Sequence, residues 1–522
     1  MTFSRKKVFD NLPISYWIDS ITPSTYPSLE DNIKIDIAII GGGLAGIQIA
    51  YQLSKENLNI AIFEANNIGH GASGYTTAKI TSQHNIIYSK IREQLGEELA
   101  QQYASANEIA IHEIKRIVEE NNIECDYTTQ SSYVYAQEEK NLQKIHDEVK
   151  AATSLGIEAS FVEDIPFPIA IKGALRFDNQ SQFHPLKYLT SLAKIISEKG
   201  VNIYEKTRII DVEEENNNYI LTTNNGKKIR AEKVIISSHY PFYNKHGLYF
   251  SRIYASRAYI IAIKAKEKYP GGMYINAEEP ARSLRYVNTP SGELILVVGD
   301  EHKTGQGEDM NKHYNALIDF AKDIFTIEDI PYRWSTQDCM TLDDLPYIGY
   351  YTANTPNLLV ATGFQKWGMT NSTVASIILK DLILKGNSPW QDVYNPSRKT
   401  IAASTKKFIT VNADVAKHLI KGKFESLDKE IDIQNGEAQV VEIDGNRVGA
   451  YKDDRGKVHF VNTTCTHMGC ELNWNNAEKS WDCPCHGSRF SHKGQILEGP
   501  AVRPLNFTED TNTIEKLFKE DF

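Results

Sequence analysis

Apolar runs and amphipathic segments alternate along the first part of the chain. The nearly continuous apolar run Ile35–Ile40 leads into three glycines and then into the helix-like segment Ile47–Lys55, and a second apolar run, Leu58–Phe63, follows. A run with so few polar positions is typical of a strand that is buried on both faces of a parallel sheet. The pattern therefore predicts a strand, helix, strand unit of an α/β domain near the N-terminus.

The central part of the chain contains one long amphipathic segment and several strand-like segments. Between residues 91 and 119 apolar residues recur every three or four positions, which predicts a helix. Strand-like runs span Ile253–Ile263 and Arg282–Gly299, and the Asn- and Glu-rich segment Glu213–Asn218 predicts a hairpin turn. This part is therefore expected to contain a second, strand-rich sheet.

The length of 522 residues is too great for one compact core and suggests about three structural units. Residues 407–428 are apolar and lysine-rich, without a clear acidic face. We expect this segment to be a linker between a main part, residues 1–406, and a small C-terminal domain, residues 429–522.

The amino-acid composition argues against some classes of binding partner. Apolar residues make up 41% of the chain, charged residues 24%, and the net charge is −10, which argues against nucleic acid or an anionic membrane surface as the main partner. Basic residues near the N-terminus are not followed by an apolar stretch, so no signal peptide is expected. No segment is long and apolar enough to predict a transmembrane span. We therefore expect a cytoplasmic location.

Cysteine and histidine gather in two short segments near the C-terminus. The first is Cys465-Thr466-His467 and the second is Cys483-Pro484-Cys485-His486. Two thiolates and two imidazoles, one of each per segment, are the ligand set of a 2Fe-2S cluster in which Cys holds one iron and His the other. A tetrahedral zinc site is the alternative, although zinc motifs usually place both cysteines in one segment and both histidines in another.

The two segments resemble the cluster-binding loops of Rieske proteins of the cytochrome bc type. The resemblance implies four cluster ligands, Cys465, His467, Cys483 and His486. It also implies that the Ser488 hydroxyl donates a hydrogen bond to a bridging sulfide, whereas Phe490 stands where many relatives have a hydrogen-bonding Tyr. Cys470 and Cys485 occupy the places of a disulfide, but cytoplasmic proteins rarely contain one. They are either a disulfide protected by burial or two free thiols.

The first apolar run leads directly into the pattern Gly-x-Gly-x-x-Gly at residues 41–46. Its first glycine permits a tight turn, its second lets the backbone approach a pyrophosphate, and its third permits close packing of helix on strand. About twenty residues further on, Glu64 ends the second strand, where a carboxylate binds a ribose hydroxyl. The residues expected to hold a dinucleotide, FAD or NAD, are Gly41, Gly43, Leu44, Ala45, Gly46, Glu64 and Ala65.

The small-residue segment Gly69–Lys79 resembles the loop that passes under the flavin in the D-amino-acid-oxidase-like family. The segments Gln182–Pro185, Thr207–Ile209 and Asn357–Met369 resemble later parts of the same family. The last of them leads into a helix starting near Thr370, whose positive end would point at the flavin pyrimidine. The resemblance favours FAD, and it adds the expected contacts Ser73, Gly74, Thr76, Thr77, Ala78, Ile209, Gly363, Gly368, Met369 and Thr370.

The two resemblances together are those of the Rieske-containing FAD oxidoreductases of bacteria. They imply an α/β FAD-binding domain of the Rossmann type, interleaved with an α+β substrate domain and followed by a small all-β Rieske domain. A second strand, Gly-x-Gly-x-x-Gly and helix unit does not occur in the sequence. A nicotinamide nucleotide site of this type is therefore not expected.

The implied reaction is the FAD-dependent dehydrogenation of an amine or amino-acid-like substrate. Electrons would pass singly to the Rieske cluster and leave through exposed imidazoles of His467 and His486 to an external acceptor, a ferredoxin, a cytochrome or a quinone. In the alternative, an external donor reduces the cluster, which reduces the flavin for a reductive or oxygen-activating reaction. A third hypothesis is a redox sensor without turnover.

Candidate catalytic residues follow from their chemistry and from their positions near the segments that resemble the flavin-binding parts. Arg285 could clamp a substrate carboxylate as a bidentate donor, or form a surface salt bridge. Lys366 and Trp367, just before the flavin-facing helix, could face the ring, or Trp367 could be packing. Lys79 and His84 are candidate proton handlers, against the alternatives of a solvated lysine and a structural histidine.

Overall fold

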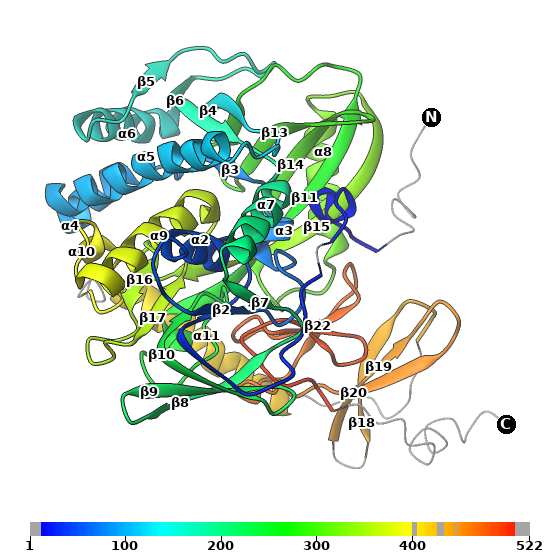
Figure 1. Ribbon diagram of the computed structural model, residues 1–522. Helices are drawn as coiled ribbons and strands as arrows, with labels where there is room; N and C mark the ends of the chain where they lie inside the picture. The colour runs from blue at the N-terminus through cyan, green and yellow to red at the C-terminus, as the bar shows by residue number, and fades with distance from the viewer. Residues whose placement is uncertain (1–11, 24, 399–403, 425–432, 444–445, 507–522) are drawn as a thin grey trace.

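The computed structural model describes residues 12–23, 25–398, 404–424, 433–443 and 446–506. Two large sheets with surrounding helices form the main part of the protein, and two small sheets form its C-terminal part (Figure 1). Among the described residues, no helix has the length and apolar character needed to cross a membrane.

The first large sheet has eight strands. Its order is β16 (Tyr347–Tyr350), β17 (Leu358–Thr362), β10 (Lys228–Ile236), β1 (Ile33–Ile40), β2 (Ile60–Phe63) and β7 (Asn202–Tyr204), with β8 (Ile209–Glu215) and β9 (Asn218–Thr223) attached. β1 runs parallel to β2 and β10, and helix α2 (Leu44–Leu53) connects β1 to β2. This is the predicted strand, helix, strand unit. The predicted hairpin turn is also present, because β8 and β9 pair antiparallel.

The apolar run of β1 is explained by burial on both faces of this sheet. Ile37 and Ile39 pack into one hydrophobic core, whereas Ala38 and Ile40 pack into a second core on the opposite face. Successive side chains of a strand point to opposite faces, so a sheet covered on both sides requires apolar residues at nearly every position.

The second large sheet has nine strands and contains the predicted strand-rich segments. Its order is β15 (Ile327–Thr341), β11 (Ile253–Ala265), β14 (Gly292–Lys303), β13 (Arg282–Thr289), β12 (Met273–Asn276), β4 (Thr128–Ala136), β6 (Gly173–Gln182) and β3 (Lys79–Ile80), with β5 (Ala159–Val162) paired to β6. Its strands lie in the sequence between those of the first sheet. The predicted interleaving of the two subdomains is therefore confirmed.

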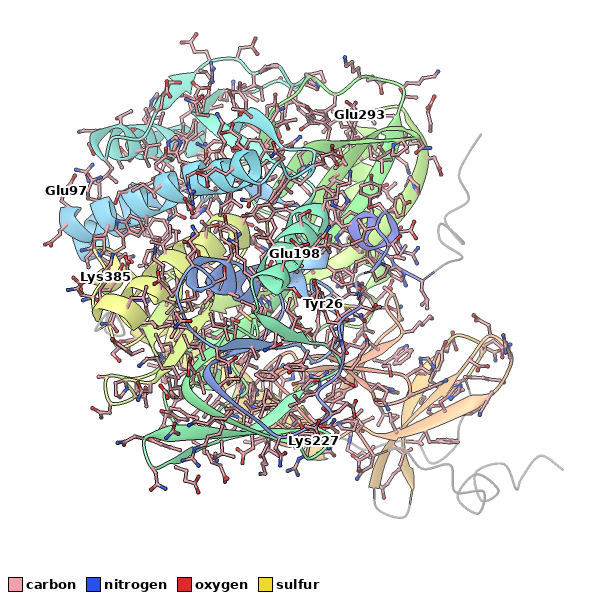
Figure 2. The ribbon with its side chains drawn as sticks, viewed as in Figure 1. Tyr26, Glu97, Glu198, Lys227, Glu293 and Lys385 are labelled. Atoms are coloured by element: carbon pink, nitrogen blue, oxygen red, sulfur yellow. A yellow bond between two sulfur atoms is a disulfide. The ribbon has the colours of Figure 1, made fainter. Side chains whose placement is uncertain are left out.

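The prediction of a single long helix over residues 91–119 is wrong in one respect. The segment forms two helices, α4 (Tyr88–Leu95) and α5 (Glu97–Glu120), because Gly96 adopts a φ of 88°, which an α-helix does not permit. Glu97 lies in the first turn of α5, and Lys385 in the last turn of α9 (Gly368–Lys385). Both side chains lie at the outer edge of the molecule (Figure 2) and carry the charge that favours their helix end.

Several shorter elements complete the main part. They are α1 (Tyr16–Asp19), α3 (Ala72–Tyr75), η1 (Glu139–Asn141), α6 (Leu142–Ser154), α7 (Pro185–Glu198), η2 (Tyr249–Ser251), α8 (Asn311–Lys322) and α10 (Gln391–Tyr394). Helix α9 packs against α2, so that the two helices lie side by side in Figure 1.

The C-terminal domain contains two small antiparallel sheets. One is β18 (Ala438–Ile443), β19 (Asn446–Lys452) and β20 (Val458–Asn462), and the other is β21 (Asn473–Asn475), β22 (Ser480–Asp482), β23 (Arg489–Ser491) and β24 (Ile496–Glu498). The first, coloured orange, projects at the lower right of Figure 1. The expected linker is helical up to Phe424 as α11 (Thr405–Phe424), and residues 425–428 lie outside the described residues.

Helix α11 contacts both parts of the protein. Its Asn412 side chain donates to the carbonyl oxygen of Ser251 in the main part at 3.0 Å, while its Val415 and Leu419 pack against the core of the C-terminal domain. The described part of the expected linker therefore helps to hold the two parts together.

Candidate flavin and iron–sulfur sites

A cavity of about 300 Å³ lies where residues of both large sheets meet. Nine of the expected flavin contacts line it: Gly43, Leu44, Ala45, Ser73, Thr76, Thr77, Gly363, Gly368 and Met369. They come from three separate parts of the sequence. The fold thus brings together the segments that the motifs singled out.

Two helix N-termini point at this cavity. Leu44 and Ala45 begin α2, and Gly368 and Met369 begin α9. The free backbone N–H groups and the positive dipole end of each helix favour a negatively charged group, such as a pyrophosphate or an electron-rich ring. The donor set fits FAD.

The glycines of the motif make close backbone contacts. A Cβ atom on Gly46 would lie 1.9 Å from the carbonyl oxygen of Gly41, and one on Gly41 would lie 2.7 Å from that of Ser237. At both positions a side chain would collide with the backbone. These contacts explain why β1 and α2 require glycine at the crossing.

The other expected cofactor contacts do not line the cavity. They are Gly41, Gly46, Glu64, Ala65, Gly74, Ala78, Ile209 and Thr370. Glu64 Oε2 accepts from the Gly42 N–H at 2.8 Å, and burial raises the pKa of this carboxyl. Ile209 lies in a hydrophobic core. For all of these residues a contact with FAD stays a prediction.

Arg285 has a different position from the one expected of a substrate clamp. Its buried guanidinium donates to the carbonyl oxygens of Thr77 at 2.7 Å and Ala78 at 2.8 Å, and it does not line the cavity. The arginine therefore holds the backbone of the expected flavin loop. Burial lowers its pKa to about 9.

Lys366 and Trp367 do line the cavity. Lys366 forms ion pairs with Glu301 at 2.6 Å and Asp338 at 3.1 Å. Burial alone would lower the pKa of this lysine, but the two carboxylates outweigh burial and raise it. Trp367 stacks on His84, with ring centroids 4.8 Å apart.

His84 is a structural histidine. Its Nδ1 lies 2.6 Å from the Tyr103 hydroxyl and its Nε2 lies 2.8 Å from the carbonyl oxygen of Thr81. Burial lowers its pKa to about 3. The neutral ring thus has partners for both nitrogens and supports the stacked Trp367.

Lys79 is buried and lines the cavity, which excludes the alternative of a solvated lysine. Its ammonium group contacts the Ser283 hydroxyl. Burial, reinforced by the nearby positive charge of Arg285, lowers its pKa to about 7. Lys79 is therefore suited to proton transfer near neutral pH.

Sequence reasoning missed several polar residues of the cavity wall. They are Asn85, His239, Glu279, Arg282, Glu301 and Asp338. Arg282 lies three positions before Arg285 on the same strand and so faces the other side of the sheet, but the sequence does not show which side faces the cavity. Its guanidinium is paired with Asp300 at 2.6 Å.

The Rieske-type ligands converge in the C-terminal domain. Cys465 and Cys483 are buried free thiols, and the rings of His467 and His486 lie 5.0 Å apart. Nδ1 of each histidine is buried without a hydrogen-bond partner. Two buried thiols and two unpaired ring nitrogens are the donors that a 2Fe-2S cluster requires.

The disulfide implied by the resemblance is present, because Cys470 is bonded to Cys485. Both sulfurs are buried, and the bond joins the two ligand segments. The Ser488 hydroxyl oxygen accepts from the Ala501 N–H at 3.0 Å. A bond from this hydroxyl to a bridging sulfide stays a prediction.

The expected exposure is wrong for His486, whereas His467 is partly exposed. His486 is only 4% exposed, and its ring packs edge-on against Phe250 of the main part. His467 Nε2 lies 2.8 Å from Nδ2 of Asn244, which also belongs to the main part. Both histidines therefore face the expected flavin domain, since the C-terminal domain docks there.

A buried ion network fixes this docking. Arg257 of β11 pairs with Glu478 and Glu498 at 2.9 Å each, and Arg489 pairs with the same two carboxylates. Burial alone would raise the pKa of Glu478, but the two arginines outweigh it and lower that pKa to about 2. The pairs of Arg257 thus cross the interface, and those of Arg489 lie within the C-terminal domain.

Comparison with known proteins agrees with both sites. The sequence matches the FAD dependent oxidoreductase family over residues 36–382, and a Rieske [2Fe-2S] domain over residues 424–509. It is 45% identical over 494 residues, 94% of this chain and 97% of the other, to the Bacillus subtilis (strain 168) protein named "Putative Rieske 2Fe-2S iron-sulfur protein YhfW".

Solved structures show the same fold for the main part. Glycine oxidase from Geobacillus kaustophilus superposes with a TM-score of 0.59 at 18% identity, over 70% of this chain and 99% of the other. L-proline dehydrogenase from P. horikoshii gives the same TM-score and identity, over 70% and 98%. The chain therefore belongs to the FAD dependent oxidoreductases, and it carries a Rieske [2Fe-2S] domain at its C-terminus.

Proposed function

We propose that this protein is a dehydrogenase of an amine or amino-acid-like substrate, and that the electrons leave through the Rieske domain to an external ferredoxin, cytochrome or quinone. When bound, FAD takes two electrons from a carbon–nitrogen bond, and a Rieske cluster carries one electron at a time. Oxidation of the amine to an imine releases two electrons and two protons, so each turnover requires two single-electron transfers.

One observation carries the proposal: strand β15 reaches both the cavity wall and a loop with an expected cluster ligand. Thr336 and Asp338 of β15 line the flavin cavity, whereas Gln337 between them donates from Nε2 to the carbonyl oxygen of Gly487 at 3.0 Å. Gly487 directly follows the expected ligand His486. Because successive side chains of a strand point to opposite faces, β15 contacts the cavity on one face and the loop of His486 on the other.

The cavity wall supports an amino-acid-like substrate. Arg282 offers a guanidinium for a carboxylate, and Glu279 and Glu301 offer carboxylates for an ammonium group. Lys79, with a pKa of about 7, is placed to accept a substrate proton. The names of the structural relatives, glycine oxidase and L-proline dehydrogenase, support the same class of substrate.

The test is anaerobic reduction of the holoenzyme with a panel of amines and amino acids. Flavin absorbance and the EPR signal of the reduced cluster are followed by stopped flow and rapid freezing. With a true substrate, flavin bleaching should precede the cluster signal. A cluster that stays oxidised while the flavin turns over with dioxygen would refute the proposal.

A redox titration distinguishes the opposite direction of electron flow. A cluster potential well below that of the flavin would favour an external donor that reduces the flavin through the cluster. The cytoplasmic location expected from the sequence stays a prediction.

A further inference from the structure

One segment of the main part reaches both expected cofactor sites. Ser237, Ser238 and His239 line the flavin cavity, and further along the same segment Asn244 and Phe250 meet His467 and His486. The contact with Phe250 is between rings, whereas the contact with Asn244 is polar. Asn244 is therefore a polar partner of an expected cluster ligand.

We propose that Asn244 is a positioning residue of the iron–sulfur cluster, whose side-chain carbonyl accepts a hydrogen bond from Nε2–H of His467. Asn244 Nδ2 and His467 Nε2 are 2.8 Å apart. Meanwhile Asn244 Oδ1 and His467 Nδ1 are both buried without a partner. Each residue of this pair thus has one buried polar atom without a hydrogen-bond partner, and the two cases point to a common cause.

Binding of iron by His467 explains why both atoms have no partner. If Nδ1 of His467 binds iron, Nε2 carries the ring proton and requires an acceptor. The oxygen and nitrogen of an asparagine amide are assigned from their hydrogen bonds, and a half-turn of the amide exchanges them. That half-turn brings Oδ1 to the position 2.8 Å from Nε2 and gives it a donor. The ligand nitrogen and the amide oxygen are then both satisfied.

This hydrogen bond has a consequence for the redox potential. An acceptor on the outer nitrogen of a ligating histidine makes the imidazole a stronger donor to the metal. A stronger donor stabilises the more positive, oxidised iron and lowers the potential. Because Asn244 belongs to the flavin domain, docking of the two domains contributes to the potential of the cluster.

The experiment is a redox titration of the full-length holoenzyme with dithionite and mediator dyes, read by EPR, in the absence of substrate. N244L keeps the size of the side chain but removes the acceptor, and it should raise the midpoint potential and shift the g values. N473A is the matched control, since Asn473 donates to Gly305 O at 2.7 Å across the same interface without touching a ligand. F250L loosens the packing on His486 without removing a hydrogen bond.

The proposal holds if N244L raises the potential while N473A and F250L leave it near the wild-type value. It is overturned if N244L titrates like the wild type, or if all three variants shift alike. Should N244L lose its iron, N244D decides, because it keeps the size and an acceptor: it should retain the cluster at a potential below the wild type, and loss of iron or an unchanged potential would overturn the proposal. The outcome is independent of the proposed substrate.

Discussion

Gln337 of the main part donates a hydrogen bond of 3.0 Å to the carbonyl oxygen of Gly487 in the C-terminal domain. Gln337 lies on β15 between two residues of the flavin cavity wall, and Gly487 follows a histidine that faces the interface. A Cβ atom on Gly487 would lie 2.3 Å from Cβ of Ala255. Ala255 lies on β11, the neighbour of β15, and the cluster loop can approach these strands so closely only because residue 487 is a glycine.

Replacing an expected cluster ligand should remove the cluster and spare the flavin. In H486A one of the two buried ring nitrogens with no partner is lost, so iron content and the EPR signal should fall nearly to zero while the FAD content stays at the wild-type level. C125A, at a buried cysteine outside the ligand segments, should keep its iron. An H486A protein with normal iron content would contradict the assignment.

The two arginines of β13 should have separable effects. R282Q removes the guanidinium from the cavity wall and should raise KM for amino-acid substrates about 10- to 100-fold, as expected for lost hydrogen bonds to a charged group. R285Q leaves the carbonyls of Thr77 and Ala78 without their donor and should reduce FAD retention. Steady-state kinetics and FAD quantification check both effects. The reverse assignment would follow if R285Q alone raised KM.

The ion network at the domain interface should contribute strongly to stability. R257Q leaves Glu478 and Glu498 with one arginine instead of two, and it should lower the free energy of unfolding by about 3–5 kcal/mol. R230Q, which breaks an exposed pair with Glu215, should cost at most about 1 kcal/mol. Denaturant titrations of both variants give the comparison. Equal decreases in the free energy of unfolding would mean that the buried network stabilises the protein no more than an exposed ion pair does.

Lys79 should make stability depend on pH. Its pKa falls from 10.5 to about 7 on folding. Between pH 7 and 10.5 the unfolded chain therefore binds a proton that the folded chain does not, and this group makes stability rise with pH. The difference in unfolding free energy, wild type minus K79M, should increase by up to about 1.4 kcal/mol per pH unit in this window. Parallel curves for the two proteins would show that Lys79 keeps its ordinary pKa.

The disulfide should stabilise the iron–sulfur domain. The two cysteines are 15 positions apart, and closing a loop of this length stabilises a fold by about 3 kcal/mol. The double variant C470S/C485S should lose its cluster absorbance at a lower temperature than the wild type, without a change in the flavin signal at 25 °C. Identical melting of the cluster in the two proteins would show that the bond is dispensable.

The parts of each site that are close in sequence were predictable. The glycines at residues 41–46 and the segments Cys465–His467 and Cys483–His486 carry their chemistry within a few residues, because a tight turn or a pair of ligands in one loop needs only local geometry. The apolar run of β1 predicted its burial for the same reason. Each of these features depends on neighbours along the chain.

The choice between Arg282 and Arg285 could not be predicted in this way. Both are arginines on one strand, and only the position of the sheet relative to the cavity decides which of them faces it. That position depends on packing between distant segments. The break at Gly96 was missed for a different reason, since the periodic pattern continues across a residue whose φ of 88° ends the helix.

The sequence by itself determined which cofactors this protein takes, because the motifs that hold FAD and a 2Fe-2S cluster are short and local. Only the tertiary structure decided how the two sites relate. Asn244, Phe250 and Gln337 meet the iron–sulfur domain across more than 100 positions of sequence, and such contacts form only when the domains dock. The burial of His486, and the contact of His467 with Asn244, are thus properties of the folded interface.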